Sequence, residues 1–326
     1  MTAPSSPLAP VIACYLTLKQ ALGRRYDAER RVLAHLDQFL SDHGADLTPD
    51  MFARWCVAQH HLASGVRRAR MRVVRNLCLY RRRREPTCFV PDLRLFPPVH
   101  QAHPPYLFSE ADIRQLLALA AALPPTLGSP LRAETYHLAL VLLYTTGLRR
   151  GEVIRLTVGD YDAQQGVLRI GASKFHKSRL VPVAPDAAQA VLGYLQARRC
   201  HGISVAPETP LLWHRTRPGP YSGGGLAQGL RQLMRRAGLH ADRGRGPRCH
   251  DLRHTFAVHA LLRWYRDGAD VQSKLPLLAA YMGHVSIVST EYYLHFVEPV
   301  ATAASDRFAR EYGTLITPLP PVGGVR

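Results

Sequence analysis

Two pairs of adjacent prolines in the stretch RLFPPVHQAHPPYLF constrain this chain more than any other feature. Proline has no backbone N–H to donate, and the residue before it disfavours the helical conformation. Residues 94–107 are therefore predicted to form an extended linker. A chain of 326 residues is long enough for a domain on each side of it. We expect an N-terminal domain at 1–93, a second domain at 108–315 and a flexible tail at 316–326, where few residues could pack.

Residues 10–90 show helical spacing of their apolar residues and little strand pattern. In ERRVLAHLDQFLSDHG the apolar residues fall on one helical face, and Gly44 is a typical helix-stop residue. Thr48 is predicted to cap the next helix, with Pro49 in the first turn. The N-terminal domain is therefore predicted to be helical.

The stretch SGVRRARMRVVRNLCLYRRRRE predicts a helix with one apolar and one basic face. The expected apolar face consists of Val66, Ala69, Val73, Leu77 and Tyr80. A charged helix face is usually only solvated, but this one is dense and of a single sign. We therefore expect the helix to lie along a phosphate backbone. The predicted DNA-contacting residues are Arg67, Arg68, Arg72, Arg75, Arg81 and Arg82.

The overall charge also indicates a polyanionic partner. Lys and Arg total 42 against 24 Asp and Glu, which gives a net charge of +18 and a pI near 10.2. Such an excess is typical of nucleic-acid binding, although a ribosome-bound or membrane-surface protein could also carry it. Most of the positive charge is arginine, whose forked guanidinium suits phosphate oxygens.

The cysteines and apolar runs indicate the compartment. No C-x-x-C pair is present, so neither a zinc ribbon nor a disulfide framework is predicted. The first residues lack the basic and long apolar regions of a secretion signal, and LALVLLYTTG is too short to span a bilayer. We expect a cytoplasmic, nucleoid-associated protein without membrane contact.

The second domain is predicted to combine helices with one pair of strands. SEAD predicts a capping box between Ser109 and Asp112, and ETYHLALVLLYTTG predicts a helix. GVLRIGASKFHKSRLVPV predicts a β-hairpin around a polar turn. Helices are expected again from about residue 185 to about residue 312, with YSGGGLAQG as a loop before the helix LRQLMRRAGL. The predicted fold is mainly α with a small β-hairpin or sheet, an α+β domain behind a helical N-terminal domain.

Several short motifs of the second domain are common when taken singly, but their order is specific. Together they resemble the tyrosine recombinase family, which includes phage integrases, Xer-type resolvases and transposon integrases. The family pattern is G-L-R-x-x-E, a hairpin lysine, H-x-x-R, then G-H and a tyrosine nine residues later. The matching residues are Gly147, Leu148, Arg149, Glu152, Lys174, His250, Arg253, Gly283, His284 and Tyr293. The resemblance covers residues 109–312, and the N-terminal region resembles the family's core-binding domain.

The resemblance implies a role for each matching side chain. A phosphodiester under attack gathers negative charge on its non-bridging oxygens, which Arg149 and Arg253 would clamp. Tyr293 would be the nucleophile, and its ordinary pKa of roughly 10 means that it needs a base. His250 would accept that proton, and Lys174 would protonate the departing 5′ oxygen.

Two further residues complete the implied site. His284 would donate to the scissile phosphate, and Glu152 would orient the pocket. Neighbouring residues are close alternatives in the sequence, but the register of the motifs disfavours Arg150, Lys177 and Tyr292.

The stretch HDLRH also allows a metal site, because His250 and His254 lie one helical turn apart. A zincin would need glutamate after the first histidine, where this chain has Asp251. Arg253 would also face the ion. We therefore expect no metal and no other cofactor, and a structural role for His254 and His259.

The predicted function is that of a site-specific DNA recombinase or integrase, most similar to those of mobile elements. It would cut and rejoin strands through a 3′-phosphotyrosyl intermediate and a Holliday junction, without ATP. The expected partners are double-stranded DNA with inverted-repeat core sites and, on DNA, three further copies, with or without sister recombinases. The helix expected in VEPVATAASDRFAREYG would dock into a neighbouring protomer, or pack on its own domain. The alternatives are a type IB topoisomerase-like enzyme and a DNA-binding regulator with a degenerate catalytic domain.

Overall fold

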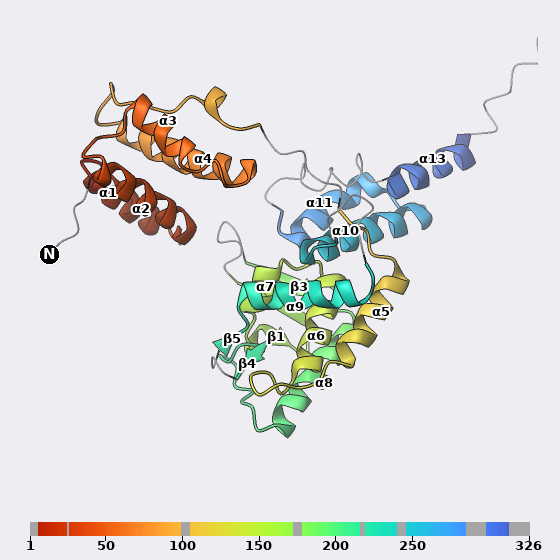
Figure 1. The fold of residues 1–326 in the computed structure, drawn as a ribbon. Coiled ribbons are helices and arrows are strands. Elements are labelled where there is room, and N and C mark those ends of the chain that lie inside the picture. The colour runs from red at the N-terminus through yellow and green to blue at the C-terminus, as the bar shows by residue number, and fades with distance from the viewer. Residues whose placement is uncertain are drawn as a thin grey trace, which may run out of the picture. The chain divides into compact units, whose positions relative to one another are not determined.

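The computed structural model describes residues 6–24, 26–98, 105–171, 178–215, 219–239, 246–284 and 298–312. The chain divides into two compact units, Met1–His103 and Pro104–Arg326. The division falls within the stretch that carries the proline pairs. Figure 1 shows helices in both units and short strands in the second.

The first unit is helical, as its sequence predicts. Its described elements are α1 (Ala9–Ala21), α2 (Asp27–Asp42), α3 (Pro49–Val57), α4 (Ser64–Arg81) and the 3₁₀ helix η1 (Leu93–Leu95). The Thr48 side chain accepts from the Met51 backbone N–H, which confirms the predicted cap. Gly44 follows α2 with a φ of 57°, the left-handed conformation expected after a helix end. Leu33, Leu36 and Trp55 lie fully buried in the core of this unit.

The predicted apolar face of α4 is confirmed in part. Leu77 is buried, and Val73 and Tyr80 pack against the core, which also takes up Met71, Val74 and Cys78. Val66, at 48% exposure, and Ala69 lie outside it. The segment that follows the helix contacts its basic flank. It returns along α4, and its carbonyl groups at residues 91 and 97 accept hydrogen bonds from arginines on the flank predicted to face solvent.

The second unit contains most of the helices and all of the described strands. Its helices are α5 (Glu110–Ala121), α6 (Arg132–Thr145), α7 (Arg150–Arg155), η2 (Val158–Asp160), α8 (Pro185–Cys200), α9 (Gly223–Arg236), α10 (Cys249–Arg266), α11 (Val271–Met282) and α13 (Glu298–Tyr312). Its strands are β1 (Tyr161–Asp162), β2 (Val167–Ile170), β3 (Arg179–Pro182), β4 (Trp213–His214) and β5 (Gly219–Pro220). The mainly helical fold with small antiparallel sheets confirms the predicted fold class.

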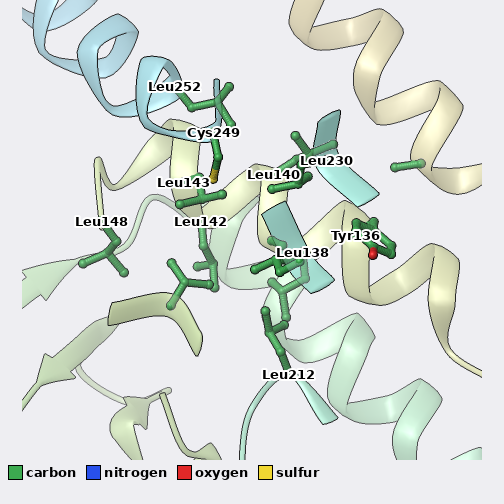
Figure 2. Close-up of a cluster of buried hydrophobic side chains, with 14 of the residues drawn as sticks. Tyr136, Leu138, Leu140, Leu142, Leu143, Leu148, Leu212, Leu230, Cys249 and Leu252 are labelled. Atoms are coloured by element: carbon green, nitrogen blue, oxygen red, sulfur yellow. The ribbon is translucent and has the colours of Figure 1, made fainter. Parts of the chain in front are cut away.

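Helix α6 lies at the centre of this unit. It is apolar around much of its circumference, and such helices are buried on several sides. Figure 2 shows Leu138, Leu140 and Leu143 of α6 surrounded by side chains of other elements, among them Leu230 of α9 and Leu252 of α10. This packing fixes α10 against the helix that leads into the Gly147 turn.

The predicted hairpin is confirmed, with additions. Strands β2 and β3 pair antiparallel, with Leu168 opposite Val181, and the polar turn between them lies outside the described residues. Strand β1 extends this sheet, and β4 pairs with β5 in a second small sheet. The sequence patterns predicted neither β1 nor the β4–β5 sheet, because strands of two residues carry no measurable periodicity.

The glycine-rich stretch after Tyr221 was wrongly predicted to be a loop. Helix α9 begins at Gly223, and the Ser222 hydroxyl caps it by accepting from the Gly225 N–H. Glycine costs about 1 kcal/mol relative to alanine in a helix interior, and here the Ser222 cap and the strong apolar face that follows outweigh this cost. The predicted capping box of Ser109 and Asp112 is confirmed at the start of α5.

Candidate active site

The turn before α7 is shaped by its glycine. Gly147 has a φ of 59°, and a Cβ there would lie 2.4 Å from the Phe256 ring of α10. Only glycine therefore fits this turn, which brings Arg149 to the N-terminus of α7. Arg150, the neighbouring candidate, is exposed on the surface of the helix.

Glu152 is the buried carboxylate of the site, with only 1% of its side chain exposed. It accepts from the backbone N–H of Arg149 and from the guanidinium groups of Arg149 and Arg179, at 2.9 to 3.2 Å. Burial by itself would raise the pKa of Glu152. The hydrogen bonds from Arg179 and Arg149 outweigh it and lower the pKa to about 2. The carboxylate therefore stays ionised and holds both guanidinium groups.

The C-terminal end of α11 gathers three arginines from distant parts of the chain. Arg179 Nε donates to the Tyr281 carbonyl at 2.7 Å. Arg253 Nη2 donates to the Met282 carbonyl at 2.7 Å, and Arg149 Nη2 donates to the Gly283 carbonyl at 2.9 Å. Helix C-termini leave carbonyl groups without helical partners and carry partial negative charge, so they suit guanidinium groups.

Arg253 lies in α10 and is only 2% exposed. Its Nη1 donates to the Gly147 carbonyl, so one guanidinium joins the turn before α7 to the end of α11. The predicted arginines Arg149 and Arg253, from separate segments, thus meet at one helix end with Glu152 and His284.

Three histidines face this group of arginines. His250 and His254 lie one turn apart on α10, with ring centroids 4.7 Å apart, and His284 follows the left-handed Gly283. Desolvation, followed by the charges of Arg253 and Arg149, lowers the pKa of His284 to about 4. Desolvation also lowers the pKa of His250, and it lowers that of His254 to about 4. All three are therefore neutral imidazoles at pH 7, and each can donate a hydrogen bond from one ring nitrogen and accept one at the other.

Two predicted residues, Lys174 and Tyr293, lie outside the described residues, together with their alternatives Lys177 and Tyr292. Of the two histidines predicted to be structural, His259 pairs with the Tyr144 hydroxyl at 3.2 Å, and His254 lies against the His250 ring. Within the described ranges, no group of three His, Cys, Asp or Glu side chains is placed to hold a metal ion. No helix in the same ranges is long and apolar enough to cross a membrane.

The sequence motifs missed Arg179 and Asp251. Asp251 is 2% exposed. Its carboxylate accepts from the backbone N–H and from the guanidinium of Arg248, which fixes the start of α10. It repeats the arrangement of Glu152, an acid three residues after an arginine that precedes a helix. Arg179 could have been found as the arginine at the start of an otherwise apolar strand.

The predicted DNA-contacting arginines of the first unit have different surroundings. Arg72 and Arg82 are exposed. Arg68 and Arg75 donate to the carbonyls of Pro97 and Pro91. Arg81 forms a fork with Asp46 at 2.7 and 2.8 Å and also binds Glu85, and Arg67 is partly buried. Several of these guanidinium groups therefore hold the unit together, whatever else they contact.

Comparisons with known proteins show the family of the chain. The profile described as "Phage integrase family" matches residues 107–298. The protein "Putative integrase/recombinase y4rB" of Sinorhizobium fredii is 31% identical over 301 residues, which cover 91% of this chain and 96% of that one. "Tyrosine recombinase XerD" of Corynebacterium glutamicum is 36% identical over 201 residues, with 61% of this chain and 60% of that protein covered.

A solved structure shares the fold. The Tn1549 transposon integrase, in complex with a circular intermediate DNA, matches 92% of this chain and 99% of its own with a TM-score of 0.62 and 16% identity. The family match spans more than half of the chain and contains the whole set of described catalytic candidates. The chain therefore belongs to the phage integrase family of tyrosine recombinases, enzymes that cleave and rejoin DNA strands.

Proposed function

We propose that this protein is a site-specific recombinase of a mobile element, which exchanges DNA strands through a 3′-phosphotyrosyl intermediate at Tyr293. One observation carries the proposal. Arg149 and Arg253 converge at the end of α11 with more positive charge than Glu152 neutralises, which is the arrangement a phosphodiester requires. Energy conserved in the phosphotyrosyl bond would allow rejoining without ATP, and a Holliday junction would connect the two rounds of exchange.

The proposed steps assign one task to each side chain. Arg149 and Arg253 bind the non-bridging oxygens of the scissile phosphate, where charge builds up as Tyr293 attacks. His250, neutral at pH 7, accepts the tyrosine proton. Lys174 gives a proton to the departing 5′ oxygen.

His284 is the remaining proposed contact to the phosphate. Its lowered pKa keeps the ring neutral among the guanidinium groups, so it acts as an N–H donor and adds no further charge. Neither a metal nor a cofactor has a task in this scheme, because the arginines supply the positive charge and Tyr293 the nucleophile.

The proposed substrate is double-stranded DNA with inverted-repeat core sites, on which four protomers assemble, with or without sister recombinases. Each site cuts one strand, so exchange between two duplexes needs four cuts and a closed ring of protomers. The net charge of +18 supports a polyanionic partner, and the exposed Arg72 and Arg82 of α4 are proposed to contact its backbone. The proposed place of action is the nucleoid.

The test of this function is a covalent trap. A nicked suicide substrate with the element's own repeats should form an adduct with the wild-type protein and with Tyr292→Phe, but not with Tyr293→Phe. Removal of one oxygen should leave the fold and DNA affinity of Tyr293→Phe intact, as measured by thermal unfolding and gel shift. An adduct that persists in Tyr293→Phe and is lost in Tyr292→Phe would place the nucleophile one residue earlier.

The same preparation separates the alternatives. A type IB topoisomerase would relax any supercoiled plasmid as a monomer, whereas a site-specific recombinase acts only on its repeats. A regulator with a degenerate catalytic domain would bind the repeats and form no adduct at all.

A further inference from the structure

Arg179 is the one arginine of the site that the family motifs do not include, and its side chain is only 10% exposed. Its guanidinium uses all three nitrogens. Nη1 and Nη2 bind the two oxygens of Glu152 at 3.2 and 2.9 Å, and Nε binds the Tyr281 carbonyl at 2.7 Å. These three bonds tie the guanidinium to the carboxylate of Glu152 and to the end of α11.

The same carboxylate holds Arg149. Oε1 of Glu152 accepts from Arg149 Nη1 at 2.9 Å as well as from Arg179, so the two guanidinium groups share one buried acceptor. A buried carboxylate between two fixed guanidinium groups has little freedom to rotate, since each oxygen is already bonded from two sides. The orientation of Arg149 thus depends on where Arg179 holds Glu152.

Arg179 also fits closely against the end of α11. A Cβ on Gly283 would lie 2.8 Å from Arg179 Nη1, so the guanidinium occupies the space that any side chain at position 283 would need. The Gly283 carbonyl is the second acceptor of Arg149. Arg179 therefore contacts both groups that hold Arg149, the carboxylate and the helix end.

We propose that Arg179 is a positioning residue, which orients Arg149 toward the scissile phosphate by fixing Glu152 against the end of α11. The inference rests on the proposed function, because it assigns Arg149 to the phosphate. Arg179 begins β3, directly after the segment that contains Lys174, so the same residue anchors this strand to the helix end.

Kinetics of two variants test the proposal. Arg179→Lys keeps the charge but cannot bind both oxygens in a fork, and Arg179→Gln removes the charge. Both should cleave a suicide substrate about 100-fold more slowly in a single turnover, the loss expected from a misplacement of about 1 Å. Their Kd for the same DNA should stay within about twofold, since the lost interaction acts in the transition state. Arg169→Gln is the matched control, because Arg169 lies on neighbouring β2, pairs with Asp162 of β1 and has a side chain that is 56% exposed.

A second comparison shows through which residue Arg179 acts. In a Glu152→Gln background, Arg179→Lys should add less than about a threefold further loss, because residues in one network are not additive. Full additivity of the two losses, or a wild-type cleavage rate in folded Arg179→Gln, would overturn the proposal. Unfolding of both Arg179 variants at the assay temperature would also overturn it, since Arg179 would then serve the stability of the whole domain.

An NMR measurement separates this inference from the proposed function. The side-chain N–H signals of Arg149, assigned with Arg149→Lys, should show slow exchange in the wild type and in Arg169→Gln, and fast exchange in Arg179→Lys. Unchanged signals in Arg179→Lys would refute the positioning role whether or not the protein cleaves DNA. If the wild type forms no adduct while the signals respond as expected, only the proposed function fails.

Discussion

At the scale of single residues, neutral histidines lie beside guanidinium groups. His254 and His284 both have pKa values lowered to about 4, first by desolvation. The next cause is repulsion between two protonated rings, His254 and His250, in the first case and the charge of Arg253 in the second. Protonation of either ring would place another positive charge beside the guanidinium groups, and for His254 the attraction of Asp251 does not outweigh desolvation. The folded chain therefore opposes protonation that the unfolded chain allows.

This difference predicts a pH dependence of stability. Unfolded histidine titrates near pH 6.5, so between roughly pH 6.5 and pH 4 the unfolded chain binds more protons than the folded one. The free energy of unfolding should fall as the pH is lowered through this range, by at most about 1.4 kcal/mol per pH unit for each group. Above about pH 6.5 these groups should contribute no slope. Urea unfolding at a series of pH values measures this dependence of the free energy of unfolding on pH.

The variant His254→Gln should show a smaller slope of the free energy of unfolding against pH, because glutamine does not bind a proton in this range. His201→Gln serves as the control, since His201 is an exposed residue at the end of α8. Equal slopes in the wild type and in His254→Gln would contradict the assignment of the pH dependence to this ring.

At the scale of elements, α4 shows how a basic helix can serve two purposes. Its apolar face packs into the core of the first unit. Arg68 and Arg75 on its flank donate to carbonyl groups of the segment at residues 89–97, which runs back along the helix. The long apolar stems of arginine let it cover this segment while the guanidinium reaches a carbonyl. Only part of the arginine run is therefore free to meet DNA.

We predict that the arginines of this run divide into two groups. Arg72→Ala and Arg82→Ala should weaken DNA binding at any sequence and reduce the slope of log Kd against log salt by about 0.9 for each lost phosphate contact. The melting temperature should stay unchanged, because both side chains are exposed. Fluorescence anisotropy at several salt concentrations measures both affinity and slope.

Arg75→Ala is the matched comparison on the same helix. It removes the donor to the Pro91 carbonyl, so it should cost about 1 to 3 kcal/mol of stability. Its effect on the salt slope should be small. A salt slope that changes as much in Arg75→Ala as in Arg72→Ala would contradict the division.

At the scale of the whole molecule, the last described helix raises the question of assembly. In the single chain α13 packs on α10, and Arg307 Nη1 donates to the Ala269 carbonyl at 2.8 Å. Figure 1 shows the two helices side by side. Leu262, Tyr265 and Thr302 line an open groove where the two helices meet.

We predict that truncation after residue 297 separates binding from assembly. Single protomers should still bind one half-site, while cooperative complexes of four protomers on paired sites should be lost, because the proposed ring needs α13 as its link. Analytical ultracentrifugation and gel shift with one or two sites measure the two properties.

Arg307→Ala provides a milder control for the packing within one chain. It should loosen α13 from α10 without removing it, so four-protomer complexes should persist or become more frequent. Full assembly by the truncated protein would show that α13 serves only its own domain.

The sequence by itself determined the features that depend on neighbouring residues. The Thr48 cap, the capping box at Ser109 and the β2–β3 hairpin each arise from contacts within one turn or one hairpin, which composition and spacing describe directly. The candidate site residues were also predictable, because the order and spacing of their motifs resemble those of the tyrosine recombinase family.

Only the tertiary structure decided which arginine meets which partner. Arg149 and the Gly283 carbonyl are 134 residues apart, Arg253 and the Gly147 carbonyl 106, and Arg179 and the Tyr281 carbonyl 102. No local pattern records such a pair, because a backbone carbonyl is the same in every residue and becomes an acceptor only when packing leaves a helix end open beside a donor. The partners of the α4 arginines were missed for the same reason. Arg68 and Arg75 donate to a segment that leaves the helix and returns to it, and that return is a property of the packed chain alone.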